Sequence, residues 1–283
     1  MGTEKHKIAF VGPGVMAEAM IAGLLREKLA LPENLLAAGP RVERGKQLQT
    51  RYGIQPFTDN AEAAKQADVV VLSVKPQRLD KVLEGLAGAV KPEALVLSIV
   101  AGARIKKIKK GLNNNNVVRA MPNTPAQIGE GITVWTTSNG VSEEQKELAC
   151  TILTALGQEV FVEEEDYLDK ATALSGTGPA YVYLFMEAMV DAGVHMGFPR
   201  RIAEQLVVET VRGSVDYFTN REDPVHLARL RNQVTSPGGT SAEALYYLEK
   251  AGFRTALSRA IWAAYERSAA LGKDAESTHK TEE

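Results

Sequence analysis

The chain has 283 residues, of which 45% are hydrophobic and 24% are charged, a composition typical of a globular protein with one large domain or two ordinary ones. Its 33 lysines and arginines against 35 aspartates and glutamates give a net charge of −2, which argues against binding to nucleic acid or an anionic membrane. With one cysteine, Cys150, and four histidines at no metal-ligand spacing, the sequence excludes an intrachain disulfide and predicts no metal site.

No run approaches the ~18 apolar residues of a membrane span, and the first residues lack the apolar stretch of a signal peptide. We therefore expect a cytoplasmic protein. The basic run 104–110 is a local exception to the charge balance. Its isoleucines lie three residues apart, which predicts a helix with a solvated basic face.

The first half of the sequence alternates short apolar runs with amphipathic stretches. The runs 69–74 and 95–100 are nearly all apolar and rich in β-branched residues, as in strands buried on both faces of a parallel sheet. Their alternation with helices predicts a Rossmann-like, doubly wound α/β domain. The expected strands are 7–11, 35–38, 55–57, 69–74, 95–100, 117–120, 132–136 and 159–162, and the expected helices include 15–28, 41–52, one capped by Asn60, and 142–155.

The pattern changes to helical periodicity after the acidic run 163–166. The expected helices are 167–174, 180–196, 199–218, 224–234, 241–250 and 255–271. We therefore predict a Rossmann domain over 1–164, an all-α dimerisation and substrate-binding domain over 165–272, and a polar tail over 273–283. So many apolar positions in a small helical segment favour a homodimer or higher homo-oligomer.

The turn Gly12-x-Gly14-x-x-Ala17 directly follows the first strand and opens a helix. Gly12 permits the tight turn, Gly14 lets the backbone approach a pyrophosphate, and Ala17 allows close packing of helix on strand. The helix then offers its first N–H groups to the anion. This motif predicts dinucleotide binding.

The end of the second strand indicates which dinucleotide is bound, because an acid there would hold the ribose 2′-OH of NAD. The sequence instead reads Ala38-Gly39-Pro40-Arg41, with Arg44 three residues further on. Either arginine could pair with a 2′-phosphate. We therefore predict NADPH as the cofactor, with NADH possible.

Three further turns follow strands and are expected at the same sheet edge. They are Val74-Lys75-Pro76, Ala101-Gly102, and the segment 119–125, whose two prolines fix a polar turn. Each of the three could have only a structural role, in forming a turn, but together they could line a nicotinamide pocket.

Two turns rich in glycine, proline and hydroxyl groups interrupt the helical half, LSGTGPAY over 174–181 and VTSPGGTS over 234–241. Each is predicted to end where a helix starts, so its N–H groups and hydroxyls could converge on a small carboxylate. The alternative is that both are ordinary helix connections.

These motifs resemble those of the Δ1-pyrroline-5-carboxylate reductase family, which catalyses the last step of proline biosynthesis. The segments that carry the resemblance are GPGVMA, SVKP, RAMPNTP, LSGTGPAY, VTSPGGTS and LEKAGFR, and it runs from about Ile8 to Leu271. The family has an N-terminal Rossmann domain and a C-terminal helical dimerisation domain, with the substrate bound at the dimer interface. The resemblance implies hydride transfer from NAD(P)H to the C=N carbon of the imino acid, giving L-proline.

The resemblance also assigns residues. Besides Arg41, the expected cofactor-binding residues are Gly12, Pro13, Gly14, Val15, Met16, Asn60, Val74, Lys75, Pro76, Ala101, Gly102 and Asn123. The expected substrate-binding residues are Gly176, Thr177, Thr235, Ser236, Gly238, Gly239, Thr240 and Ser241, and Ser241 is the candidate catalytic residue. Two positions depart from the family: NADPH-using members often have serine in place of Gly39, and a threonine that binds the substrate nitrogen is Ser241 here.

Two other functions would account for parts of this pattern. A β-hydroxyacid dehydrogenase of similar layout needs a lysine on the first long helix of the second domain, and 180–196 contains none. A non-catalytic NADP-sensing protein would keep the glycine loop but would not need two hydroxyl-rich turns.

Overall fold

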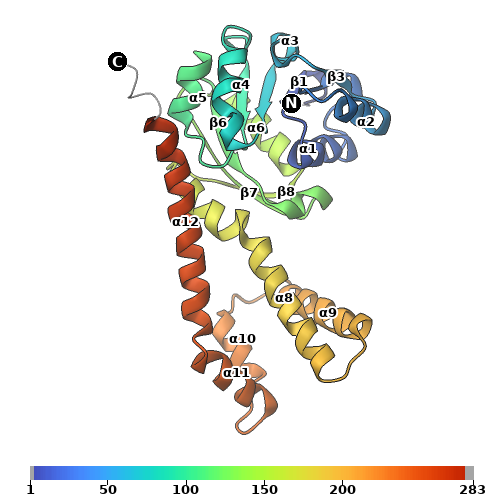
Figure 1. Cartoon of the computed structure of the whole chain (residues 1–283), viewed down its shortest axis with the longest axis vertical. Helices are drawn as coiled ribbons and strands as arrows, with labels where there is room; N and C mark the ends of the chain where they lie inside the picture. Colours follow the sequence, from blue (N-terminus) through green and yellow to red (C-terminus); the bar gives the residue numbers. More distant parts are fainter. Residues whose placement is uncertain (1–2, 278–283) are drawn as a thin grey trace. The chain divides into compact units, whose positions relative to one another are not determined.

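The computed structural model describes residues 3–277 (Figure 1). The chain divides into two compact units: residues 1–178 with 263–283, called here the first unit, and residues 179–262, called the second unit. The division predicted after residue 164 falls inside the first unit and stays a prediction. No helix in the described range is both long and apolar enough to cross a bilayer.

The first unit is built on a single sheet, which among the described residues has eight strands in the order β3-β2-β1-β4-β5-β6-β7-β8. All neighbours are parallel except β6 and β7, which are antiparallel. The strands are β1 (Ile8–Val11), β2 (Leu35–Ala38), β3 (Gln55–Phe57), β4 (Val69–Leu72), β5 (Leu95–Ser98), β6 (Val117–Met121), β7 (Gly131–Thr137) and β8 (Gly157–Phe161). The doubly wound α/β fold predicted from the sequence is confirmed.

Both faces of the sheet are covered, because alternate residues of a strand point to opposite faces. On β1, Ile8 and Phe10 enter one buried cluster, and Ala9 and Val11 enter the other. The first cluster is completed by α1 (Val15–Arg26), α2 (Val42–Tyr52) and α6 (Glu143–Thr154). The second is completed by α3 (Asn60–Gln66), α4 (Leu79–Leu86) and α5 (Ile105–Leu112).

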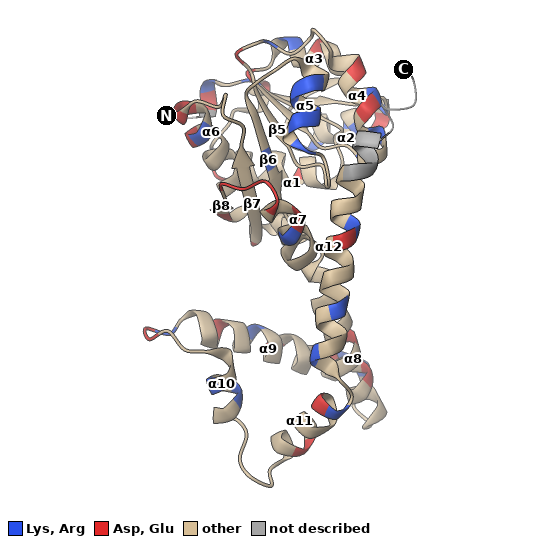
Figure 2. Cartoon of the chain, turned by 90° about the vertical axis from the view of Figure 1, so that its left-hand side faces the viewer, with Lys and Arg blue, Asp and Glu red and all other residues tan. Residues whose placement is uncertain are grey.

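The basic run lies on α5, where Ile105 and Ile108 are buried against the sheet. Figure 2 shows the lysines of this helix as a blue band, and Lys107 pairs with Asp80. The predicted solvated basic face is confirmed in part: Lys106 and Lys110 are exposed, whereas the side chains of Lys107 and Arg104 are 14% and 26% exposed and are paired with acids.

The helix predicted to begin at Asn60 does begin there, but the predicted cap is wrong. The N-cap of α3 is Asp59, whose carboxylate accepts a hydrogen bond from the amide of Ala61 at 2.8 Å. An aspartate one residue earlier satisfies the free amide of the first turn. The side chain of Asn60 therefore does not cap this helix.

The turn predicted over 174–181 is also wrong, because this segment is helical. α7 (Tyr167–Ala171) continues into a π-helical turn, η5 (Thr172–Gly176), and α8 (Gly178–His195) follows. The amide of Thr177 donates to the carbonyl of Thr172 at 2.8 Å, the wide spacing of a π turn. Pro179 has no N–H to donate, so the chain can leave the α-helical register here.

The second unit contains most of α8 together with α9 (Arg200–Thr219), α10 (Leu227–Gln233) and α11 (Thr240–Lys250), and the first part of α12 (Phe253–Ser277). Its buried hydrophobic core is small and consists of Val190, Ala203 and Val207. Large apolar side chains such as Leu184, 66% exposed, and Trp262, 62% exposed, lie on its surface.

Candidate active site

The loops predicted to hold a dinucleotide all follow parallel strands of the first unit. They come after β1, β2, β4, β5 and β6, so they lie at the carboxyl edge of one sheet. The chain order reverses between β1 and β4, the topological switch point at which open α/β sheets bind ligands.

The loop after β1 fits closely against the loop after β4. Gly12 has φ +89°, and a Cβ atom there would lie 2.5 Å from Val74 Cγ1, so both backbone and space require glycine. Ser73 Oγ lies 3.0 Å from the carbonyl oxygen of Val11 and 2.9 Å from that of Gly12. Ser73, the first residue of the SVKP segment, therefore stabilises the turn after β1 through these two carbonyl oxygens.

Gly14 differs from Gly12 because the fold does not require it. Its φ is −80°, and a Cβ atom there would meet only the carbonyl oxygen of Gly12, at 3.8 Å. Gly14 is the N-cap of α1 and gives no side-chain cap, so the first amides, those of Val15 and Met16, have no acceptor in the helix. A glycine with open space beside free amides fits a bound pyrophosphate.

Asn60 supports the same assignment. Its side-chain oxygen Oδ1 is buried and has no hydrogen-bond partner among the residues that the structure describes. A buried polar atom normally has a partner, so this oxygen fits a ligand contact such as that predicted with the adenosine part of the cofactor.

The two arginines after β2 have different environments. Arg44 Nε donates to the carbonyl oxygen of Pro13 at 2.9 Å, and its guanidinium pairs with Glu18. Burial opposes ionisation of Glu18, but hydrogen bonds from Arg44 and from Tyr52 lower its pKa below the usual value. The prediction that Arg44 could bind a 2′-phosphate is therefore wrong, because its guanidinium is already bound to the glycine loop and to Glu18.

Arg41 is exposed, precedes the first residue of α2, and makes no ion pair within the described part of the chain. Its guanidinium is available for a phosphate group.

The loops after β5 and β6 contain the residues predicted near the nicotinamide. Gly102 has φ +71°, and a Cβ atom there would lie 2.9 Å from Leu271 Cβ on α12. Asn123 Oδ1 accepts from the amide of Ile132 at 3.0 Å, which fixes the turn between β6 and β7. Val74, Lys75 and Pro76 form the turn after β4, with Pro76 opening a short 3₁₀ helix (Pro76–Arg78).

Arg119 does not line this turn, although it lies at the start of the segment predicted to do so. Its side chain is 2% exposed and donates to Asp169 Oδ1 and to Glu165 Oε1, each at 2.9 Å. Asp169, 2% exposed, also accepts from Ser268 Oγ at 3.0 Å and pairs with Arg104 at 2.9 Å. We call Arg104, Arg119, Glu165, Asp169 and Ser268 the buried ion network.

The predicted substrate residues Gly176 and Thr177 have structural contacts in the first unit. A Cβ atom on Gly176 would lie 2.9 Å from Met121 Cε, so the π turn packs closely against the end of β6. The hydroxyl of Thr177 donates to the carbonyl of Thr172 at 2.9 Å.

The predicted substrate loop over 235–241 lies in the second unit, where it follows α10 and ends in the first two residues of α11. Gly238 has φ +71°, and Gly239 is the N-cap of α11 without a side-chain cap. Thr235 Oγ1 donates to the carbonyl of Arg231 at 2.7 Å, which anchors the start of the loop. Ser241 is the second residue of α11, after Gly239 at the N-cap, so its hydroxyl does not cap this helix.

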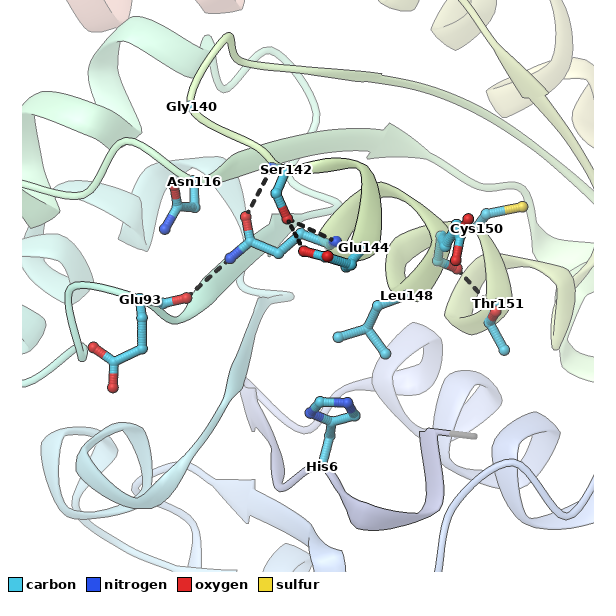
Figure 3. A pocket seen from close by; sticks show the side chains of 11 residues that line it. His6, Glu93, Asn116, Gly140, Ser142, Glu144, Leu148, Cys150 and Thr151 are labelled. Carbon is cyan, nitrogen blue, oxygen red and sulfur yellow. Dashed lines mark hydrogen bonds between the residues drawn. The ribbon is translucent and has the colours of Figure 1, made fainter. Parts of the chain in front are cut away.

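A cavity of about 730 Å³ in the first unit lies elsewhere (Figure 3). It is lined by His6, Glu93 and Asn116, which precede β1, β5 and β6, and by one side of α6. It therefore lies at the amino edge of the sheet, opposite the edge that carries the predicted dinucleotide loops. Gln145 Nε2 closes part of it by donating to the carbonyl of Glu93 at 2.9 Å.

The fold and this site define an NAD(P)-dependent oxidoreductase built on a Rossmann domain. Residues 7–102 match a family described as NADP oxidoreductase, coenzyme F420-dependent, and residues 165–271 match the pyrroline-5-carboxylate reductase dimerisation family. The chain belongs to the pyrroline-5-carboxylate reductase family, whose members reduce pyrroline-5-carboxylate to proline.

Two relatives illustrate the extent of the similarity. The pyrroline-5-carboxylate reductase of Synechocystis sp. is 43% identical over 94% of this chain and 98% of its own length. That of Pseudomonas aeruginosa is 39% identical over 94% of this chain and 97% of its own length. The crystal structure of Plasmodium falciparum pyrroline carboxylate reductase with NADP bound matches with a TM-score of 0.87 and 34% identity, covering 96% of this chain and 100% of that one. The predicted family, fold class and enzyme class are confirmed.

Proposed function

We propose that this chain reduces 1-pyrroline-5-carboxylate to L-proline with NADPH as the cofactor, in the cytoplasm. The observation that carries the proposal is the similarity to pyrroline-5-carboxylate reductases over nearly the whole chain, which includes the cofactor loops and the substrate loop. The test is consumption of NADPH by the purified chain when pyrroline-5-carboxylate is added, with proline identified as the product. A protein that binds NADPH but does not oxidise it with this substrate would contradict the proposal.

The first unit supplies the cofactor site. The amides of Val15 and Met16 bind the pyrophosphate at the amino end of α1, and Arg41 binds the 2′-phosphate. NADPH, when bound, supplies the hydride. The loops of Val74–Pro76 and Ala101–Gly102, with Asn123, hold the nicotinamide at the carboxyl edge of the sheet.

The loop over 235–241 supplies the carboxylate site. The first amides of α11, those of Thr240 and Ser241, have no acceptor within the helix, and the positive end of the helix dipole favours an anion there. Ser236, Gly238 and Gly239 bring the backbone close to that end. Orientation of the two reactants, rather than a strong acid or base, is the protein's contribution to the reaction.

Ser241→Ala is expected to lower kcat/KM by about tenfold or more, since a hydrogen bond to a charged group contributes about 1.5–3 kcal/mol. Its melting temperature should change little, because Ser241 follows the cap position of α11. Ser241→Thr should retain activity. Steady-state kinetics and thermal unfolding measure both effects, and a Ser241→Ala enzyme of wild-type efficiency would refute the contact with substrate.

The second unit forms the interface of a homodimer, or of a higher homo-oligomer. Its exposed apolar side chains, among them Tyr183 at 61% and Leu184 at 66%, exceed what its own small core can cover. The matched family model for 165–271 is that of a dimerisation region. Sedimentation at micromolar concentration should show a particle of at least twice the chain mass of 30.6 kDa. A monomer throughout would contradict this prediction.

A further inference from the structure

The tip of β2, where dinucleotide-binding proteins recognise the ribose 2′ substituent, has no side chain at position 39. A Cβ atom on Gly39 would lie 2.7 Å from Pro13 Cδ and 3.3 Å from Pro13 Cγ. Gly39 is not among the glycines with positive φ, so its backbone conformation does not require glycine. The constraint on this position therefore comes from the proline ring in the neighbouring loop.

Pro13 is held in place and cannot move aside easily. Its ring is fused to the backbone, and its carbonyl oxygen accepts from Arg44 Nε at 2.9 Å. Glu18 holds Arg44 and also accepts hydrogen bonds from Arg51 at 2.8 Å and from the hydroxyl of Tyr52 at 3.0 Å. On the other side of the loop, the amide of Gly14 donates to the carbonyl of Gly12 at 2.7 Å.

We infer that Pro13 and Gly39 form an interlocked pair that determines how the cofactor's 2′-phosphate is recognised. The proline ring occupies the space that a side chain at position 39 needs, so β2 offers neither a hydroxyl nor an acid to the ribose. Recognition of the phosphate then depends on the charge of Arg41. The inference rests on the proposed use of NADPH and identifies Pro13 as a residue that determines specificity indirectly.

A second consequence concerns salt. Arg41 is exposed, and interactions between exposed charges are screened at high ionic strength. The preference for NADPH over NADH should therefore decrease as salt increases, while the affinity for NADH should change less.

The test measures dissociation constants for NADPH and NADH by calorimetry, with the purified full-length chain and without substrate. Gly39→Ser should raise the dissociation constants of both NADPH and NADH by about tenfold or more, because the added side chain displaces the Pro13 ring and its loop. Adding Pro13→Ala to Gly39→Ser should restore most of the NADPH affinity. In the wild-type background, Arg41→Ala should raise the dissociation constant of NADPH by about tenfold or more and change that of NADH little. In the Pro13→Ala, Gly39→Ser background the same change should weaken NADPH binding much less, because the serine hydroxyl also contacts the phosphate.

Thermal unfolding without cofactor gives an independent readout. Gly39→Ser should lower the melting temperature, and the added Pro13→Ala should recover it. If Gly39→Ser alone matches the wild type in stability and in both affinities, or if Pro13→Ala does not rescue it, the interlock is refuted. Failure of the proposed function is distinguishable, since it would appear as a wild-type chain that binds NADPH but does not reduce pyrroline-5-carboxylate, or that does not bind NADPH.

Discussion

Gly14→Val is expected to abolish NADPH binding and leave the first unit folded. The valine side chain would enter the open space beside the first amides of α1, where the pyrophosphate must lie, and affinity should fall by about a hundredfold or more. Cofactor titration measures the loss, and thermal unfolding checks the fold.

Two other glycines provide controls for this variant. Gly85→Val adds the same side chain in open space on α4, away from the loops, and should leave NADPH affinity unchanged. Gly12→Val should lower stability as well as affinity, because Gly12 combines positive φ with a close contact to Val74. Normal NADPH titration by Gly14→Val would disprove the assignment of this loop.

Asp169→Ala is expected to destabilise the first unit by about 3–5 kcal/mol, because removing one partner of a buried ion pair leaves an uncompensated buried charge. Arg119 is 2% exposed and would retain only Glu165 as an acidic partner. Denaturant unfolding measures the change in the free energy of unfolding.

The exposed pair of Arg26 and Glu27 is the control, with side chains 44% and 50% exposed. Glu27→Ala should cost less than about 1 kcal/mol. The double variant Arg119→Met with Asp169→Leu should lose less stability than Asp169→Ala, because it removes both charges that are 2% exposed, while Glu165 keeps the amide of Ile105 and Arg104 keeps Asp166 as partners. If Asp169→Ala were as stable as Glu27→Ala, the buried ion network would have no role in holding the unit together.

The sheet could be predicted from the sequence because local pattern determines it. Runs such as 69–72 are short, apolar at every position and rich in β-branched residues, and that combination is typical of a strand covered on both faces. The glycine loop after β1 was predictable for a similar reason, since its geometry depends on residues adjacent in the chain.

The contacts that could not be predicted join residues distant in sequence. Arg44 binds the carbonyl of Pro13, 31 positions away, and Asp169 binds Ser268, 99 positions away. Nothing local distinguishes Arg44, bound to the loop, from Arg41, which is free for a ligand. The π turn after Ala171 was missed because glycine, serine and proline usually indicate a loop, and here hydroxyl groups bond carbonyls of the preceding turn instead.

The bond from Ser268 to Asp169 bears on the order in which the protein is made. The first unit is discontinuous, since residues 263–272 return to it after the second unit has been synthesised. On the ribosome, the sheet could form early, but Gly102 would still lack its contact with Leu271, and Asp169 its contact with Ser268, until almost the whole polypeptide has emerged. A nascent chain that stops before residue 263 therefore lacks part of the first unit even when the whole second unit has been made, and it would expose an unfinished nucleotide-binding domain to the quality-control machinery.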